Sequence, residues 1–160
     1  MLIDADGIAK ISDFGISKKN EYKAAYQRMT RCSMQGSVNW MAVEVVKGKG
    51  YSAKVDIWSL GCLVLEMLTG NPPWHGVQGS IIYLLGTGNA PPAPEWLSPL
   101  SKAFISKCFT IDPEMRPTAT ELLSDPWTLV DPYSYDFSKW INEKNNEDDV
   151  HSDSSDITTE

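Results

Sequence analysis

The sequence predicts a mainly helical fold with one small β-hairpin. The strongest observation is a run of helix-forming residues from Lys54 to Thr69 that carries many apolar side chains. A second helical pattern covers residues 97–109, where apolar residues recur every three or four positions. An Asp-Gly pair at residues 6–7 separates two short apolar runs and indicates a tight hairpin.

The length and charge of the chain indicate one domain of ordinary size followed by an acidic tail. The chain has 160 residues, of which 42% are hydrophobic and 22% charged, so it is long enough for one domain with a core. The net charge is −7, and residues 143–160 hold seven acidic residues and one lysine. We expect this tail to be disordered. The nearly neutral body lacks the basic field that binding to nucleic acid requires.

The cysteines and the apolar runs point to a cytoplasmic protein. Cys32, Cys62 and Cys108 lie far apart without a CxxC spacing, which favours a reducing compartment and disfavours a zinc site. The longest apolar run, near residues 57–68, is shorter than the roughly 20 residues that span a bilayer. No signal peptide is recognisable at the start. We therefore expect no membrane partner.

The first third of the chain is predicted to form a hairpin, a long loop and a short helix. Residues 1–4 and 8–11 are the expected strands, and residues 16–40 show no period and predict a long loop. Residues 42–47 suggest a short helix that Gly48 ends.

The central helix is expected to begin after Ser52, a suitable N-cap, and to end at Gly70 before two prolines. Because it is apolar nearly all round, it should lie buried in the core.

Three further segments follow. Residues 80–85 suggest a short helix, and residues 90–94 an extended proline-rich connector. The helix at 97–109 should bury a stripe made of Leu100, Phe104, Ile105 and Cys108. A last helix through Leu123 can be capped by Thr118.

Four short motifs occur in a fixed order along this framework. Asp13-Phe14-Gly15 follows the hairpin, and Trp40-Met41-Ala42-Val43-Glu44 ends the long loop. Asp56-Ile57-Trp58-Ser59-Leu60-Gly61 opens the central helix, and Asp112-Pro113-Glu114-Met115-Arg116-Pro117 precedes the last one. Each motif alone is weak, but jointly they are specific. From residue 1 to about 128 the chain resembles the C-terminal lobe of a eukaryotic protein kinase.

The resemblance is strongest to one group of kinases. The strings GSVNWMA and YSAKVDIWSLGCLVLEMLTGNPPW are similar to the sterile-type MAP kinase kinase kinases, particularly those of fungi. This implies a partial kinase-like fold over residues 1–128, followed by an extension at 129–142 and the acidic tail at 143–160. It also implies ATP-dependent phosphorylation of protein serine and threonine in a MAP kinase cascade.

The resemblance assigns nucleotide and metal roles near the hairpin. Asp13 corresponds to the family aspartate that holds Mg²⁺ against the phosphates of ATP. Leu2 matches the residue that lies against the adenine ring. Phe14 is expected to pack beneath Asp13, and Gly15 to permit backbone reversals in the switch.

The long loop is implied to be regulatory and to position the substrate. Thr30 and Ser33 stand where related kinases are phosphorylated by an upstream kinase. Ser37 and Trp40 match the segment that contacts the residue after the phosphorylated one, and they favour serine and threonine substrates. The implied protein substrate is a MAP kinase kinase.

Five further residues are given architectural roles by the resemblance. Glu44 and Arg116 are expected to form a buried ion pair. Asp56 should brace the catalytic loop, whereas Leu63 and Met67 should support the residues under the nucleotide.

Two departures from the family pattern matter. Val43 replaces a proline, which should loosen the turn while Glu44 keeps its role. The sequence also contains no glycine-rich loop, strand lysine or His-Arg-Asp catalytic loop. We therefore expect the 160-residue chain by itself to bind ATP weakly and to transfer no phosphate, and we interpret it as a truncated reading frame. The alternative is an inactive lobe that acts as a binding or regulatory module.

Overall fold

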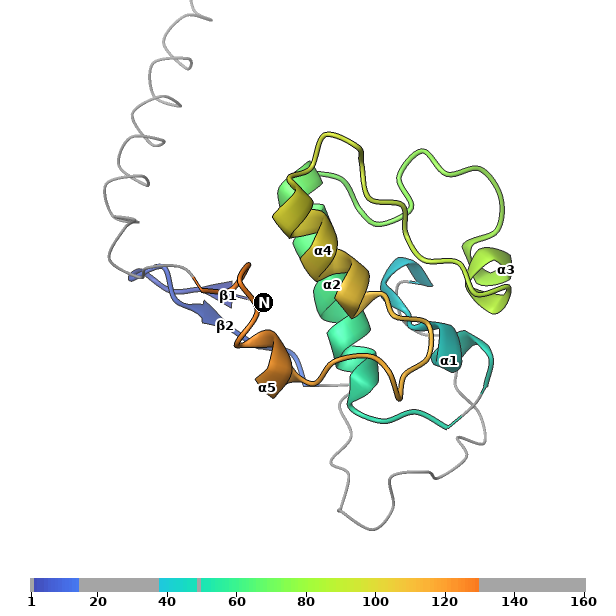
Figure 1. Ribbon diagram of the computed structural model, residues 1–160, viewed down its shortest axis with the longest axis horizontal. Helices are drawn as coiled ribbons and strands as arrows, with labels where there is room; N and C mark the ends of the chain where they lie inside the picture. Colours follow the sequence, from blue (N-terminus) through green and yellow to red (C-terminus); the bar gives the residue numbers. More distant parts are fainter. Residues whose placement is uncertain (1, 15–37, 49, 130–160) are drawn as a thin grey trace, which may run out of the picture. The chain divides into compact units, whose positions relative to one another are not determined.

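The computed structural model describes residues 2–14, 38–48 and 50–129 (Figure 1). These residues fall into two compact units, a hairpin within residues 1–19 and a helical unit within residues 20–129. Four of the predicted site residues lie outside the described residues, namely Gly15, Thr30, Ser33 and Ser37, as do the extension and the acidic tail from residue 130 onward.

The hairpin is confirmed, and an aspartate organises its turn. Strand β1 (Leu2–Ile3) pairs antiparallel with β2 (Ala9–Lys10), so that Leu2 faces Lys10. The Asp4 carboxylate accepts the amide of Ile8 at 2.8 Å and lies 2.8 Å from the Lys10 ammonium. The lysine first, and then the Ile8 amide, lower the pKa of Asp4.

The helical unit contains every helix that the sequence predicts. These are α1 (Val43–Val46), α2 (Lys54–Thr69), α3 (Ile81–Gly86), α4 (Pro99–Cys108) and α5 (Ala119–Leu122). One difference lies at the end of the predicted loop, where Val38–Trp40 form a 3₁₀ turn, η1. No helix in the described part of the chain is long and apolar enough to cross a membrane.

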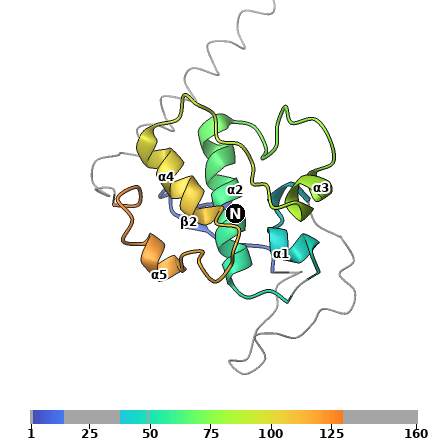
Figure 2. The same cartoon turned by 45° about the vertical axis from the view of Figure 1, so that its right-hand side comes forward.

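The core lies between α2 and α4, which run side by side in Figures 1 and 2. Trp58 of α2 packs against Phe109 with ring centroids 5.1 Å apart, and Phe104 stacks on Trp127 at 4.4 Å. Cys62 and Cys108 are both free and buried in this core. Burial raises the pKa of Cys62 to about 12 and that of Cys108 to about 11, so both thiols stay protonated and unreactive at neutral pH.

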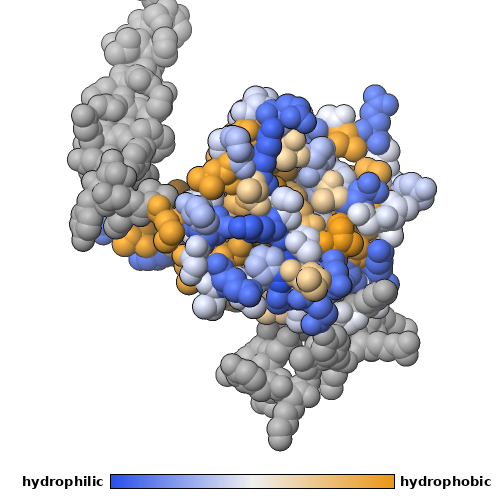
Figure 3. All heavy atoms as spheres, viewed as in Figure 1, coloured by the Kyte–Doolittle hydropathy of each residue, from blue (hydrophilic) through white to orange (hydrophobic). Residues whose placement is uncertain are grey.

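Helix α2 lies in the core, as expected, but part of its surface is exposed. Leu60 and Met67 are 37% and 63% exposed, whereas Ile57, Trp58 and Leu65 are buried. The exposed positions lie on one stripe of the helix, which the described elements packed on α2, chiefly α4 and η1, leave uncovered. Figure 3 shows apolar and polar side chains interspersed over one face of the helical unit.

The N-terminal ends of the helices correct two local expectations. The N-cap of α2 is Ala53 and not Ser52, although the Ser52 hydroxyl still accepts the Lys54 amide at 3.3 Å. In α4, Leu100 is 48% exposed and Ser101 is buried in its place.

The position of the α4 cap explains this shift. Ser98 caps the helix and accepts the Ser101 amide at 3.1 Å, and Pro99 occupies the first turn. The helix therefore begins later than the apolar pattern suggests, and Ser101 faces inward, where its hydroxyl accepts the Trp127 indole N–H at 3.1 Å. The cap of α5 agrees with the prediction, because Thr118 and Glu121 form a reciprocal capping box.

Replacing Gly61 by alanine is expected to destabilise the helical unit by about 1–3 kcal/mol. A methyl group at Gly61 would lie 2.6 Å from the Cys108 β-carbon and 2.9 Å from the Phe109 ring, so α2 and α4 would have to separate. Alanine gains about 1 kcal/mol of helix propensity, which is too little to offset the clash. Urea unfolding followed by tryptophan fluorescence measures the change.

Gly86→Ala is the matched control, because nothing lies within 4 Å of a methyl group at that helical position. It should be neutral or slightly stabilising. Equal stability of both variants would show that α2 and α4 do not pack as closely as described.

Candidate functional site

Asp13 lies just after the hairpin in a strained backbone conformation. Its φ angle is 63°, a left-handed value that aspartate tolerates better than most residues but that still carries strain. Residues held in such conformations cluster at functional sites. The residue is exposed.

One carboxylate fits only one kind of metal site. Among the described residues, no three His, Cys, Asp or Glu side chains come together in a way that could hold a metal ion. Magnesium is commonly bound by one or two carboxylates together with substrate phosphates. Asp13 therefore fits as one ligand of a nucleotide-bound Mg²⁺, and not as part of a metal cage made by these residues alone.

Both apolar residues that the resemblance assigns to the nucleotide site are exposed. Phe14, expected to pack beneath Asp13, is 67% exposed. Leu2 is 63% exposed, and its expected contact with an adenine ring stays a prediction. The reason is physical: a two-stranded ribbon has no second layer and buries little of its own surface.

Trp40 is held on α2 by hydrogen bonds at two points. Its indole N–H donates to the Glu66 carboxylate at 3.1 Å, and its carbonyl oxygen accepts the Ser59 hydroxyl at 3.1 Å. The Cys62 thiol approaches the carbonyl of the neighbouring Asn39 at 3.8 Å. The sequence alone did not predict these α2 residues as partners of η1. Their spacing along one helix face, three and four residues apart, is the only sequence signal that could have indicated them.

The structure brings Glu44 and Arg116 together across 72 residues. The two guanidinium nitrogens donate to the two carboxylate oxygens at 2.8 and 3.0 Å, which is a bidentate pair. Both residues are buried, with Arg116 only 1% exposed. Glu44 is placed by the first turn of α1, whose buried Val43 begins the helix where the family has proline.

Further partners complete the surroundings of Arg116. It also donates to the carbonyls of Thr110 at 2.9 Å and Lys54 at 2.7 Å, and its guanidinium lies 5.1 Å from the centre of the Trp58 ring. The Lys54 ammonium in turn bonds to the Arg116 carbonyl. The loop before α5, the start of α2 and α1 are thus tied together at one buried cation.

The other architectural residues lie on α2 without comparable contacts. Asp56 is in the first helical turn and exposed, and no carboxylate partner for it is found among the described residues. Desolvation by nearby protein atoms raises its pKa. Leu63 is partly buried, whereas Met67 is 63% exposed. The brace and the support that the resemblance implies involve the catalytic loop, whose motif the sequence lacks, and the nucleotide, so both roles stay predictions.

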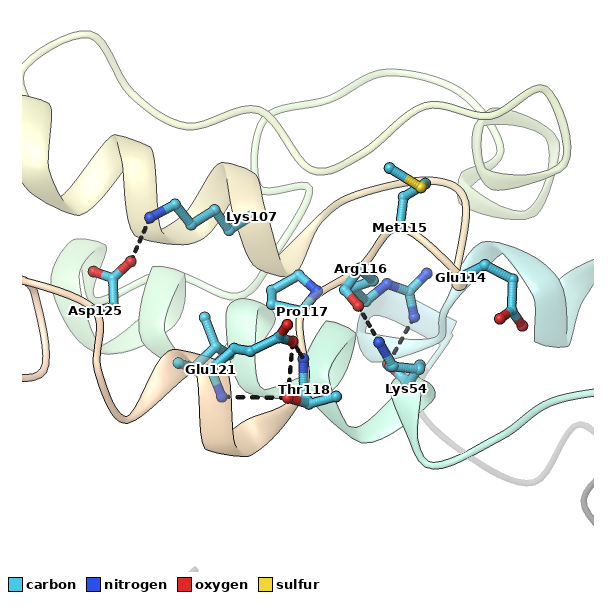
Figure 4. A pocket seen from close by; sticks show the side chains of 10 residues that line it. Lys54, Lys107, Glu114, Met115, Arg116, Pro117, Thr118, Glu121 and Asp125 are labelled. Carbon is cyan, nitrogen blue, oxygen red and sulfur yellow. Dashed lines mark hydrogen bonds and ion pairs between the residues drawn. The ribbon is translucent and has the colours of Figure 1, made fainter.

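A shallow pocket of about 450 Å³ opens beside Arg116. Figure 4 shows Lys107 pointing to Asp125, and Thr118 close to Glu121. These pairs are hydrogen-bonded, the first at 2.6 Å and the second at 2.8 Å, so the polar groups that line the pocket are used within the fold. We therefore interpret the pocket as a result of packing between the elements and not as a ligand site.

Asp125 should make the helical unit sensitive to acid. The Lys107 ammonium first, and then the Trp127 amide, lower the pKa of the buried Asp125 carboxylate. A lowered folded-state pKa stabilises the fold above the unfolded-state value of about 3.9, and this contribution is lost as the pH falls through the folded-state pKa. Asp125→Asn should therefore be less stable at pH 7, with a deficit that shrinks below about pH 4. Urea midpoints between pH 2.5 and 7 test this, and a deficit independent of pH would contradict it.

The motifs and their contacts agree with comparisons to known proteins. Residues 1–128 match the protein kinase domain family. The chain is 52% identical to the mitogen-activated protein kinase kinase kinase MCK1 of Pyricularia oryzae over 86% of its own length and 9% of that protein. It is 49% identical to the MAP kinase kinase kinase mkh1 of Schizosaccharomyces pombe, covering 82% of the chain and 12% of the relative.

A third relative is the serine/threonine-protein kinase BCK1/SLK1/SSP31 of Saccharomyces cerevisiae, which is 50% identical over 81% of the chain and 9% of that protein. The chain thus spans between 9% and 12% of the length of these three relatives. The family match covers the hairpin, the buried Glu44–Arg116 pair and all the described helices. This chain therefore belongs to the protein kinase domain family.

Proposed function

We propose that this chain supplies the second half of the catalytic domain of a serine/threonine kinase of the MAP kinase kinase kinase type. The similarity to relatives with that name supports the proposal. The observation that carries it is the bidentate Glu44–Arg116 pair, at 2.8 and 3.0 Å. This pair ties the end of the substrate-binding loop to the last helices. A lobe that positions a protein substrate needs such an anchor.

Asp13 acts on the nucleotide in this proposal. Its exposed carboxylate holds the Mg²⁺ of ATP, and the ion supplies positive charge against the phosphates during transfer. Leu2 offers an exposed apolar surface to the adenine ring from the neighbouring strand.

The protein partners follow from the loop and η1. Trp40 and Ser37, which lies three residues before it, position a serine or threonine of a MAP kinase kinase. An upstream kinase phosphorylates Thr30 or Ser33, and the added charge orders the loop on nearby basic residues. We place this activity in the cytoplasm, on the ground of the three scattered cysteines.

A fusion kinase tests the proposal. The catalytic domain of Schizosaccharomyces pombe mkh1, up to the residue that aligns with Met1, is joined to the full 160-residue chain. This adds a glycine-rich loop, a strand lysine and a catalytic loop from a relative that is 49% identical. The fusion kinase should transfer γ-phosphate from ATP to serine and threonine of a MAP kinase kinase, only when Mg²⁺ is present.

The outcome separates an enzyme from a binding module. Magnesium-dependent phosphoserine or phosphothreonine in the substrate supports the proposal. A fusion kinase that folds cooperatively but transfers nothing would refute it and favour the inactive binding lobe. Phosphotyrosine as the main product would refute the assigned substrate class.

A further inference from the structure

One face of the hairpin is apolar and exposed. Ile3 and Ala9 are cross-strand partners, so their side chains share a face, and Ile11 follows two residues after Ala9 on the same side. All three are exposed, Ile3 by 65% and Ile11 by 75%. A two-stranded ribbon is only marginally stable by itself in water, whereas three strands with an apolar face can be stable. The hairpin therefore calls for a further strand.

The outer edge of β2 can accept such a strand. The Asp4 amide donates to the Ile8 carbonyl at 3.1 Å, so these two residues form a hydrogen-bonded pair. Because such pairs alternate with non-bonded pairs along an antiparallel ladder, the backbone groups of the next pair, Ile3 and Ala9, point away from the partner strand. In an extended chain, Ile11 presents its backbone groups in the same direction as Ala9.

The edge of β2 is the longer of the two. Among the described residues the sheet contains β1 and β2 alone (Figure 1), so both outer edges are unpaired within that part of the chain. The edge of β2 offers the amides and carbonyls of Ala9 and Ile11, whereas the edge of β1 offers those of Ile3. An added strand therefore gains more hydrogen bonds on β2.

Residues 133–138 lie outside the described residues, but their sequence has the pattern of such a strand. Aromatic and polar residues alternate strictly there, in the order Tyr133, Ser134, Tyr135, Asp136, Phe137 and Ser138. This alternation is typical of a strand with one apolar face, and aromatic residues favour strands. With the aromatic residues beside Ala9 and Ile11, the polar face would bring Asp136 to the side of Lys10, whose side chain is 63% exposed.

We propose that residues 133–138 pair with the outer edge of β2 and add a third strand to the hairpin. Main-chain hydrogen bonds hold the strand, and its aromatic side chains extend the apolar face of the ribbon. Asp13 lies three residues after β2, so the added strand also restrains the segment that carries Asp13. This second consequence rests on the proposed function, in which Asp13 holds Mg²⁺.

Hydrogen exchange of backbone amides in the full 160-residue chain, followed by NMR, tests the pairing. The Ala9 and Ile11 amides should exchange at least about 10-fold more slowly than the Ile3 amide at the outer edge of β1. Proline at both 135 and 136 removes the inward-pointing amide in either register, so this variant should bring all three amides to the same fast rate. Tyr135→Phe keeps the ring and the amide and should leave Ala9 and Ile11 slow.

The matched control places the same two prolines beyond the alternating segment. Replacing Asn145 and Asn146 by proline should leave the exchange of Ala9 and Ile11 unchanged. Fast exchange of these amides in the unmodified chain, or slow exchange that survives the prolines at 135 and 136, would overturn the inference. Protection that disappears on dilution would show pairing with a second copy of the chain and would overturn it as well.

The consequence for Asp13 is tested in the fusion kinase. The prolines at 135 and 136 should raise the KM for ATP at fixed Mg²⁺ by roughly 3–10-fold, with the KM for the protein substrate unchanged. The prolines at 145 and 146 should change neither constant. An active fusion kinase whose KM for ATP does not rise would overturn the restraint on Asp13. A folded fusion kinase that is inactive without any substitution would refute the proposed function, whereas the exchange experiment would still decide the pairing.

Discussion

Replacing Glu44 by alanine is expected to lower the free energy of unfolding of the helical unit by about 3–5 kcal/mol. The substitution leaves Arg116, which is 1% exposed, buried without its carboxylate partner. Its bonds to the Thr110 and Lys54 carbonyls remain, but neutral oxygens do not compensate a full positive charge. Urea unfolding measures the loss. A loss of this size approaches the whole free energy of unfolding of a small domain.

An exposed ion pair provides the control for Glu44→Ala. Glu95 and Lys102 lie 3.3 Å apart, and the Glu95 side chain is fully exposed. Glu95→Ala removes the same chemical group and should change stability by less than about 1 kcal/mol. Similar losses in both variants would mean that the burial of the Glu44–Arg116 pair carries no special energy.

Replacing Asp13 by asparagine is expected to reduce the turnover of the fusion kinase by at least about 100-fold. Asparagine has nearly the same size but lacks the charge that holds Mg²⁺ against the phosphates. The fold should persist, because Asp13 is exposed and outside the helical core. The loss should therefore fall on kcat, with the melting temperature unchanged.

Asp6→Asn controls for the chemistry of the substitution. Asp6 is an exposed aspartate in the turn of the same hairpin, seven residues before Asp13. Its replacement should preserve turnover within about twofold, since it changes only a surface charge. Equal turnover of all three proteins would show that Asp13 holds no essential metal ion.

Much of the fold could be predicted because it depends on local signals. The Asp-Gly turn, the helical period of Lys54–Thr69 and the capping box at Thr118 each act within a few residues. The Glu44–Arg116 contact is different, because nothing local links positions 72 residues apart. It could be anticipated only from the resemblance to kinases.

The rest depends on which neighbours surround an element. An apolar helix suggests burial, yet Met67 is 63% exposed because the packed elements leave one stripe of α2 uncovered. Ser52 was expected to cap α2, although the helix begins one residue later than that position requires. The hydrogen bonds of Trp40 with Ser59 and Glu66 join two segments across the fold, and the helical spacing of the two α2 residues does not indicate which segment they meet.

The most direct test of the account is the incorporation of labelled γ-phosphate into a MAP kinase kinase by the fusion kinase, compared with its Asp13→Asn variant at matched folded concentrations. The account predicts magnesium-dependent labelling of serine and threonine by the unmodified fusion, and labelling lower by at least about 100-fold by the variant. Equal labelling by both proteins, or none by either although both melt cooperatively, would contradict it.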